Sequence, residues 1–252
     1  MVVKSDPISK KTAEYLKKIL IDDYDEENPD KVITVGGDGT FLKAVHQYES
    51  QLDKIDFFIF NTGHLGYFSN FDTESLNDLL TKFNGNNYDI GNYTLLEYHI
   101  ELTDSVISGV ALNEVTIINP TRTLMLDVYM NNSLLEQFRG TGICISTPAG
   151  STGYNKSLGG AVVDASIEAF QVTEIASINS KIHHTLSSPV VLSKKHEVEF
   201  KAEENSTIWI TADSKSLNID NFNSLSITLS DKKVRYVKNS VGFIDRLKKN
   251  FI

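Results

Sequence analysis

Apolar residues recur along this chain at two different spacings, and the spacing changes near Gly91. In the first third, apolar positions at helical spacing predict amphipathic helices, at 9–20, 40–49 and 73–83. Short continuous apolar runs predict buried strands, at 32–35 and 55–60. Asp72 or Thr73 is the expected N-cap of the third helix.

This alternation of strand and helix predicts a parallel sheet with helices on its faces. Both predicted strands end in turns that contain glycine, after Val35 and after Phe60. Open α/β sheets bind ligands at the carboxyl ends of their strands. The two turns are therefore candidate binding turns.

Beyond Gly91, short apolar and β-branched runs alternate with polar residues, with turn residues between them. They predict strands at 98–102, 113–117, 124–129, 197–200, 207–211, 224–229 and 234–237. Asn131-Asn132, between two of these runs, is a hairpin signal. The series predicts an antiparallel β-sandwich or a related β domain. Residues 240–252 carry a basic helical pattern.

Composition narrows the class of protein. A length of 252 residues suits one large domain or two modest ones. The formal net charge of −9 argues against general binding of nucleic acid, which favours basic surfaces. The single cysteine, Cys144, excludes an intrachain disulfide. We find neither a signal peptide nor an apolar run long enough to span a bilayer, and we expect no membrane partner and a cytoplasmic protein.

The turn Gly36-Gly37-Asp38-Gly39-Thr40 carries the clearest chemical signal. It lies between a predicted strand and a predicted helix, where glycines leave amide groups accessible to an anion and the helix N-terminus adds positive charge. A carboxylate repels phosphate, so Asp38 suggests a specific task, such as holding a metal ion or orienting or deprotonating a hydroxyl. The alternative is a tight turn whose solvent-facing Asp caps the helix.

Three further segments are candidates for ligand binding. The stretch 61–68 combines small, polar and aromatic residues; its rings suit either a nucleobase or the core. Asn113-Glu114 in an apolar strand suits the vicinal hydroxyls of a ribose, or marks a solvated strand end. Residues 138–160 are rich in hydroxyls and glycine and predict a long loop, for binding or at the surface. No cluster of His, Cys and Asp has metal-site spacing.

Four motifs in register resemble the NAD kinase family: the turn at 36–40, the stretch 61–67, Leu-Asn-Glu at 112–114 and the segment 146–155. The match extends over nearly all of the chain. The glycine turn alone is shared with lipid kinases and phosphofructokinases. In lipid kinases an Asn-Glu pair usually follows that turn almost at once, whereas here it lies far downstream, which favours NAD kinase.

The resemblance implies a Rossmann-like α/β domain over 1–91, a β-sandwich-like NAD-binding domain over 92–237, and a segment 238–252 that packs back on the first domain. It implies transfer of the terminal phosphate of ATP, or of polyphosphate, to the 2′-hydroxyl of the adenosine ribose of NAD, giving NADP. Mg²⁺ would accompany the nucleotide, with few direct protein ligands. A homodimer or homotetramer is expected.

The resemblance also implies roles for individual residues. Asp38 is the expected catalytic base or orienting group. The expected phosphate- and ATP-binding residues are Gly36, Gly37, Gly39, Thr40 and Asp213. The expected NAD-binding residues are Asn61, Tyr67, Phe68, Asn113, Glu114, Arg139, Thr141, Ser151, Thr152, Tyr154 and Ser157.

Three positions depart from the family pattern. Thr141 stands where the family usually has Asp, near the nicotinamide, and Gly153 where it usually has Ala. Ser214 replaces a residue that is often Gly or His. Two rival functions therefore stay open: a lipid or sugar kinase that shares the glycine turn, and a non-catalytic protein that senses NADP(H).

Overall fold

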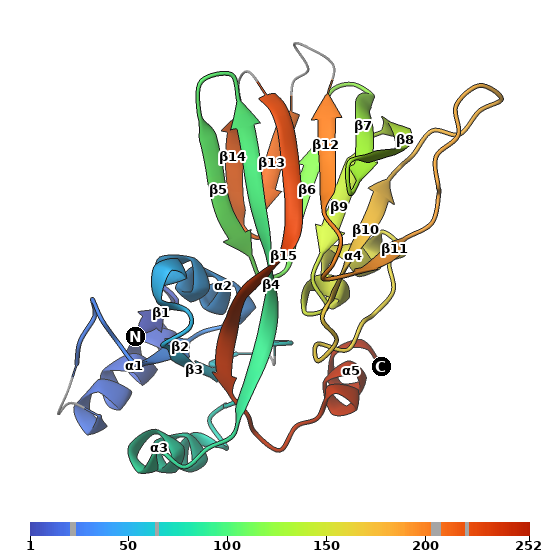
Figure 1. Cartoon of the computed structure of the whole chain (residues 1–252). Helices are drawn as coiled ribbons and strands as arrows, with labels where there is room; N and C mark the ends of the chain where they lie inside the picture. Colours follow the sequence, from blue (N-terminus) through green and yellow to red (C-terminus); the bar gives the residue numbers. More distant parts are fainter. Residues whose placement is uncertain (21–23, 64–65, 203–207, 220–221) are drawn as a thin grey trace. The chain divides into compact units, whose positions relative to one another are not determined.

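A computed structural model describes residues 1–20, 24–63, 66–202, 208–219 and 222–252 (Figure 1). The chain forms two compact units. Unit 1 consists of two chain segments, Met1–Tyr93 and Lys232–Ile252, and unit 2 of Thr94–Asp231. Two long strands, β4 (Ile90–Leu102) and β15 (Phe222–Val237), run from one unit into the other.

Unit 1 contains the predicted parallel sheet. Its strands are β1 (Val2–Val3), β2 (Lys31–Val35), β3 (Asp56–Phe60) and the last part of β15. Strand β2 lies between β1 and β3, and β15 pairs with the far edge of β3. The apolar runs at 32–35 and 55–60 are thus buried strands, as predicted.

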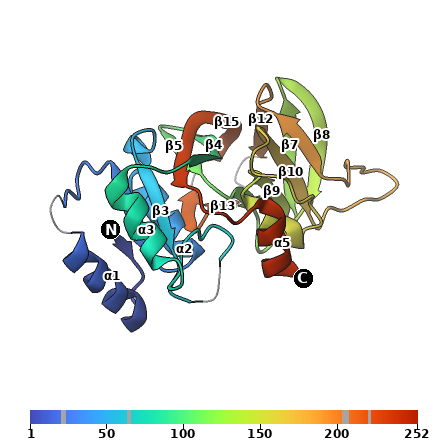
Figure 2. The same cartoon turned by 90° about the horizontal axis from the view of Figure 1, so that it is seen from below.

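Helices cover both faces of this sheet. They are α1 (Pro7–Ile19), α2 (Asp38–Gln47) and α3 (Leu76–Gly85), with a short 3₁₀ turn at Glu49–Gln51. Helix α5 (Phe243–Phe251) also belongs to unit 1. Ile33 and Phe58 form one apolar cluster with Leu16 of α1 and Leu79 of α3. Side chains alternate along a strand, so Phe57 faces the other way, where its ring meets Phe41 of α2. Figure 2 shows α3 and α2 on opposite sides of β3.

Helix α3 begins later than predicted. Its N-cap is Ser75 rather than Asp72 or Thr73. Asp72 Oδ1 instead accepts hydrogen bonds from the backbone N–H groups of Glu74 and Ser75 and from the Ser75 hydroxyl. The aspartate therefore closes a separate turn before the helix, because its side chain competes for the amides that a helix would use.

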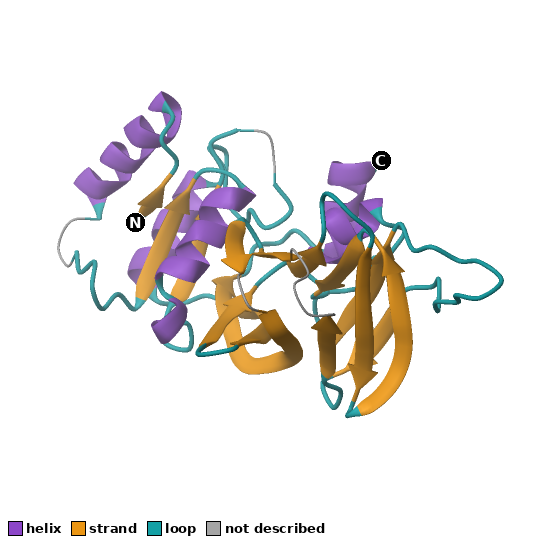
Figure 3. Cartoon of the chain, turned by 90° about the horizontal axis from the view of Figure 1, so that it is seen from above, coloured by secondary structure: helices purple, strands orange, loops and turns teal. Residues whose placement is uncertain are grey.

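Unit 2 consists of two antiparallel sheets (Figure 3). The first has the order β5-β4-β15-β12-β7-β8, and its further strands are β5 (Val106–Ala111), β7 (Leu124–Met130), β8 (Ser133–Gly140) and β12 (Val198–Ala202). The second has the order β11-β10-β9-β6-β13-β14, with β6 (Glu114–Ile118), β9 (Gly142–Ser146), β10 (Ala169–Ile175), β11 (Val190–Ser193), β13 (Ile208–Ala212) and β14 (Lys215–Ile219). Asn131 and Asn132 have positive φ and form the predicted hairpin turn between β7 and β8.

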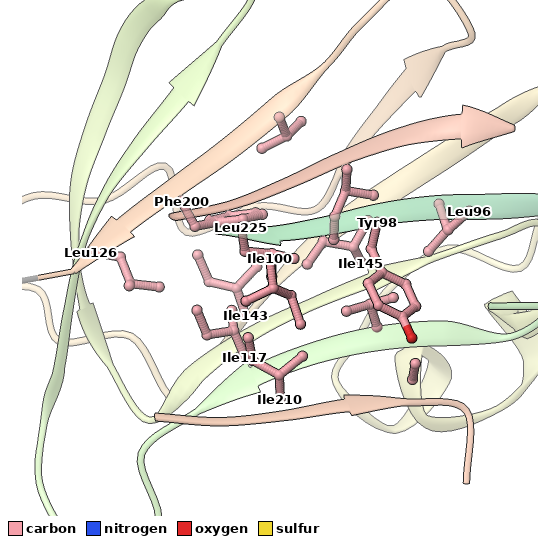
Figure 4. Close-up of a cluster of buried hydrophobic side chains, with 14 of the residues drawn as sticks. Leu96, Tyr98, Ile100, Ile117, Leu126, Ile143, Ile145, Phe200, Ile210 and Leu225 are labelled. Carbon is pink, nitrogen blue, oxygen red and sulfur yellow. The ribbon is translucent and has the colours of Figure 1, made fainter. Parts of the chain in front are cut away.

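The core of unit 2 lies between the two sheets. Figure 4 shows side chains of one sheet, such as Ile117, Ile143 and Ile210, next to side chains of the other, such as Ile100 and Phe200. These five side chains are fully buried. An α/β unit followed by a β-sandwich-like unit is the fold class predicted from the sequence, and that prediction is confirmed.

The prediction of a long loop over 138–160 is wrong for its first part. Residues 138–140 belong to β8 and 142–146 to β9. Strand β9 lies in the middle of the second sheet, between β6 and β10. Its residues Ile143, Cys144 and Ile145 are fully buried, so burial outweighs the glycines and hydroxyls that flank them.

Candidate active site

The glycine turn of unit 1 lies at the carboxyl end of β2, next to the carboxyl end of β3. Gly36 donates its N–H to Phe60 O at 2.9 Å, and a Cβ at this position would overlap the Thr40 side chain. A Cβ at Gly37 or Gly39 would meet no atom within 4 Å. Gly36 thus closes the turn, whereas Gly37 and Gly39 border open space at the start of α2, whose first amides have no intrahelical partner.

Two backbone amides hold the Asp38 carboxylate. Tyr67 N–H donates to Oδ2 at 2.8 Å and Phe68 N–H donates to Oδ1 at 3.1 Å. A Cβ on Gly66 would overlap the same carboxylate, so glycine is needed there. Burial raises the pKa of Asp38 above its usual value, while the two amides and the Arg246 charge oppose that rise. Asp38 is therefore an oriented, half-buried carboxylate, and the N-cap of α2 is Gly37.

In the second glycine segment, Asn61 and the two aromatic residues are buried. Asn61, directly after β3, accepts a hydrogen bond from Gly63 N–H at 2.9 Å. Tyr67 and Phe68 are 8% and 2% exposed. The Phe68 ring centroid lies 5.2 Å from that of Phe41, so this ring belongs to the core of unit 1. His64 and Leu65 lie outside the described residues.

In unit 2, Asp213 organises the turn that presents Asn113 and Glu114. Asp213 is the turn residue between β13 and β14, with φ +53°. Its Oδ2 accepts from Leu112 N–H at 2.9 Å, and its Oδ1 accepts from the N–H groups of Asn113 at 2.7 Å and Glu114 at 3.3 Å. The Asp213 carboxylate thus contacts protein amides about a hundred residues away in sequence, which the sequence pattern did not suggest.

Asn113 and Glu114 carry the most distinctive electrostatics of unit 2. Burial and the neighbouring Asp213 charge raise the pKa of Glu114 to about 7. Glu114 Oε2 and Asn113 Oδ1 are buried oxygen atoms without a hydrogen-bond partner. Buried acceptors without partners are costly, so their presence suits a ligand that donates hydroxyl or amino protons. A Cβ on Gly153 would lie 3.5 Å from Glu114 Oε2, an ordinary contact.

The segment 147–163 continues from β9 and contains a 3₁₀ turn (Gly150–Thr152) and α4 (Tyr154–Ser157). Ser151 is fully buried; its hydroxyl donates to Pro148 O at 2.6 Å and accepts from Val163 N–H at 2.9 Å. Thr152 Oγ1 donates to Ala149 O at 3.3 Å. Ser151 thus shapes the segment itself, whereas the Tyr154 and Ser157 side chains are exposed.

A buried polar contact attaches this segment to the sheet beneath it. Thr173 of β10 donates its hydroxyl to Asn155 Oδ1 at 2.7 Å, and Asn155 is fully buried. Gln171, two residues earlier on the same strand face, accepts from Ala161 N–H at 2.8 Å. Neither polar side chain was among the predicted site residues, because sequence alone does not show what covers a strand.

The remaining predicted NAD-binding residues, Arg139 and Thr141, lie at the end of β8 and between β8 and β9. Arg139 is half-buried on β8. Thr141 is exposed between β8 and β9; its N–H donates to Ile175 O at 2.9 Å and its carbonyl accepts from Asn119 N–H at 3.0 Å. The backbone at this position is therefore held, while the side chain is accessible.

Arg246 of α5 is a further residue that the sequence did not single out. It is 7% exposed and donates to Tyr67 O at 3.1 Å, to the Tyr93 hydroxyl at 2.9 Å and to Asn70 Oδ1. A nearly buried arginine in a basic helical pattern looks like any surface cation in the sequence. Only the fold shows that this one points inward.

Among the described residues, no group of three or more His, Cys, Asp or Glu side chains could hold a metal ion. In the part of the chain that the structure describes, no helix is both long and apolar enough to cross a membrane.

An oriented carboxylate in a glycine turn at a helix N-terminus, in unit 1, and buried oxygens without protein partners, in unit 2, are features that suit a nucleotide-dependent phosphotransferase. Two family models match the chain: the ATP-NAD kinase N-terminal domain over residues 3–88 and the ATP-NAD kinase C-terminal domain over residues 112–239. The chain belongs to the NAD kinase family.

Curated relatives agree with this assignment, and solved structures share the fold. An NAD kinase of Geobacillus stearothermophilus is 42% identical over 255 residues, covering 99% of this chain and 94% of that protein. An NAD kinase of Staphylococcus aureus (strain Newman) is 40% identical over 238 residues, covering 93% and 88%. The crystal structure of an NAD kinase from Archaeoglobus fulgidus in complex with ATP has a similar fold, with a TM-score of 0.76 at 23% identity, over 98% of this chain and 96% of that one.

Yeast NADH kinase, solved with NADH, also shares the fold, with a TM-score of 0.78 at 23% identity over 87% of this chain and 65% of that one. The protein is thus an enzyme, a kinase of the NAD kinase family. The family match decides against the lipid- or sugar-kinase alternative.

Proposed function

We propose that the protein transfers the terminal phosphate of ATP, or of polyphosphate, to the 2′-hydroxyl of the adenosine ribose of NAD, giving NADP. The observation that carries this proposal is the Asp38 carboxylate, held by the amides of Tyr67 and Phe68 inside a glycine turn at a helix N-terminus. A carboxylate repels phosphate, so its presence in this turn suits a function that a neutral side chain does not perform, namely to orient and deprotonate a hydroxyl group.

In the proposed reaction, Asp38 orients the 2′-hydroxyl and accepts its proton while the hydroxyl oxygen attacks the terminal phosphorus. The bond from that phosphorus to the bridging oxygen breaks, and ADP, or the shortened polyphosphate, leaves with the electron pair. The two amides leave further lone pairs of the carboxylate available for that hydroxyl. A pKa raised by burial makes Asp38 a stronger base than an ordinary aspartate. Such a step needs accurate positioning and charge neutralisation more than covalent help.

The phosphates are proposed to lie against the start of α2. The open space beside Gly37 and Gly39 admits them, and the first amides of the helix supply donors and positive partial charge. Thr40 and Gly36 shape this turn from within. Mg²⁺ would enter with the nucleotide as part of the substrate and would neutralise phosphate charge.

The nucleoside part of NAD is proposed to contact unit 2. Asn113 Oδ1 and Glu114 Oε2 accept its hydroxyl or amino protons, which gives these buried oxygens the partners they lack in the protein. Arg139, Thr141, Thr152, Tyr154 and Ser157 are proposed contacts, as are Asn61, Tyr67 and Phe68 of unit 1. Asp213 and Ser151 act indirectly, because their polar atoms hold the backbone around this site.

Assembly into a homodimer or homotetramer and a cytoplasmic location also remain proposals. Unit 2 carries exposed large apolar side chains that suit contact with a second copy: Leu134, Leu135, Ile178, Ile182 and Leu186. Light scattering on the purified protein measures the number of subunits. A monomer at micromolar concentration would contradict the proposed assembly.

A coupled assay with Mg²⁺, ATP and NAD, which follows NADP, tests the activity. We expect turnover in the parent, and a fall of kcat by roughly 10² or more in Asp38→Asn with an unchanged melting temperature. Polyphosphate replaces ATP in a parallel assay to define the donor. NADP binding without turnover by the parent would support the sensing alternative and overturn the proposed reaction.

A further inference from the structure

Arg246 is connected to Asp38 through a single peptide group. The guanidinium donates to Tyr67 O at 3.1 Å, and that carbonyl belongs to the same peptide group as Phe68 N–H. Phe68 N–H donates to Asp38 Oδ1 at 3.1 Å. A hydrogen bond to the carbonyl of a peptide polarises its N–H, so the first bond strengthens the second.

The other contacts of Arg246 fix where its guanidinium lies. Nη1 also donates to the Tyr93 hydroxyl at 2.9 Å, and the Tyr93 ring stacks on Tyr236 at a centroid distance of 4.1 Å. Nη2 donates to Asn70 Oδ1, and Asn70 Nδ2 donates to Val237 O at 2.9 Å, at the end of β15. The Arg246 guanidinium is therefore fixed next to the sheet of unit 1, and its hydrogen bonds fix the loop at 67–70 in turn.

We propose that Arg246 is a positioning residue for phosphoryl transfer, which orients the peptide group between Tyr67 and Phe68 and thereby the Asp38 carboxylate. This inference rests on the proposed role of Asp38. Arg246 touches no reacting atom in this scheme; it acts through Asp38.

The charge of Arg246 has a second effect on the same carboxylate. The groups that bear on Asp38 among the described residues are the amides of the 67–68 loop and the guanidinium of α5. Burial raises the pKa of Asp38, and the positive charge works against that rise. Arg246 thus keeps Asp38 ionised at lower pH, which a residue with a purely structural role would not do.

The test compares Arg246→Met, which keeps the aliphatic stem, Arg246→Lys, which keeps the charge, and Lys248→Ala, which removes an exposed cation from the same helix. We expect Arg246→Met to lower kcat roughly tenfold or more with little change in KM for ATP and NAD. The acidic limb of its pH–rate profile moves to higher pH. Arg246→Lys lies between Arg246→Met and the parent, and Lys248→Ala matches the parent.

The pH profile separates positioning from simple destabilisation. If folded Arg246→Met keeps the parent kcat, or loses kcat without movement of the acidic limb, the proposal is overturned. If Arg246→Met does not fold, the neutral but polar Arg246→Gln replaces it and is judged by the same two criteria. Its loss of kcat with a displaced acidic limb supports the proposal, and an unchanged profile overturns it.

A double-variant cycle distinguishes this inference from the proposed role of Asp38. In an Asp38→Asn background, Arg246→Lys should cause little further loss of kcat, because its effect passes through the missing carboxylate. An equal loss in both backgrounds means that Arg246 acts independently, and only the positioning role fails. If Asp38→Asn alone keeps the parent kcat, the catalytic role of Asp38 fails, and the positioning role fails with it.

Discussion

At the scale of single residues, Glu114 couples stability to pH. Its pKa rises from the usual 4.5 to about 7 in the folded protein, so ionisation opposes folding. The contribution of neutral Glu114 to the free energy of unfolding is fully present below about pH 4.5. It is lost as pH rises through about 7, a change on the order of 3 kcal/mol.

Replacing Glu114 with Gln removes this dependence. Without nucleotide, we expect the melting temperature of Glu114→Gln minus that of the parent to increase from pH 5 to pH 8. The reason is that only the parent ionises the buried Glu114 carboxyl group in this range. Thermal unfolding across this pH range measures the difference, with Glu14→Gln on the surface of α1 as control. At pH 8 the same variant should bind NAD more weakly, since an amide cannot replace both acceptor oxygens. Parallel pH profiles for parent and variant would contradict the altered pKa.

Gly66 tests how closely the Asp38 carboxylate must be held. A methyl group at this position would lie 2.6 Å from Asp38 Cγ, so either the carboxylate or the 66–68 loop has to move. We expect Gly66→Ala to lower kcat roughly a hundredfold while the protein stays folded, because small displacements of a reacting group are costly. Gly85→Ala, where a Cβ meets no atom within 4 Å, is the matched control. Equal kcat values for these two variants would show that the close approach at Gly66 is irrelevant.

At the scale of elements, the contact between Thr173 and Asn155 should determine how well the segment 147–163 is held. Thr173→Val keeps the shape of the side chain but leaves the buried Asn155 Oδ1 without this donor. We expect a loss of about 1–3 kcal/mol in stability and a higher KM for NAD, with a smaller effect on kcat.

The control for that substitution is Thr211→Val on the same sheet. It removes a similar hydrogen bond, 2.6 Å long, to Thr116, which does not involve the segment 147–163. Denaturant unfolding and steady-state kinetics on both variants separate the two effects. A KM for NAD that rises equally in both variants would argue against a specific role of Asn155.

Local patterns allowed most elements to be predicted. The strand, glycine turn and helix around Asp38 are contiguous in sequence, and so is the Asn131-Asn132 hairpin, so their residues alone specify them. Strand β9 was missed because its central place depends on partners that are distant in sequence, in β6 and β10.

The partners of the candidate site residues could not be predicted for the same reason. The contacts of Asp213 with 112–114 and of Arg246 with Tyr67 join residues about 100 and 179 positions apart. Ser151 illustrates the reverse case. Its place in a motif suggested a pocket wall, whereas its hydroxyl is used entirely by the backbone around it.

At the scale of the whole molecule, two spectroscopic signals distinguish the units. Trp209, the single tryptophan, lies on β13 of unit 2, whereas α1, α2, α3 and α5 belong to unit 1. Deleting residues 242–252 removes Arg246, whose hydrogen bonds lie within unit 1. We expect the shortened protein to lose its far-ultraviolet helix signal at a lower denaturant concentration than the full chain does. Its Trp209 fluorescence transition should stay near that of the full chain. Equal shifts of both transitions would mean that the units unfold as one.

The strand β15 gives unit 1 an unusual dependence on the order of synthesis. Residues 1–93 leave the ribosome early, but their sheet receives its last strand, and their loop at 67–70 its arginine, only from 232–252. Unit 2 lies between these two segments in the chain, so it can fold before unit 1 is complete. An incomplete translation product that ends between residues 232 and 245 would thus contain the Asp38 turn and all of unit 2, yet lack the arginine proposed to position the Asp38 carboxylate. Phosphoryl transfer by such a shortened form would be slower than that of the full chain by roughly tenfold or more.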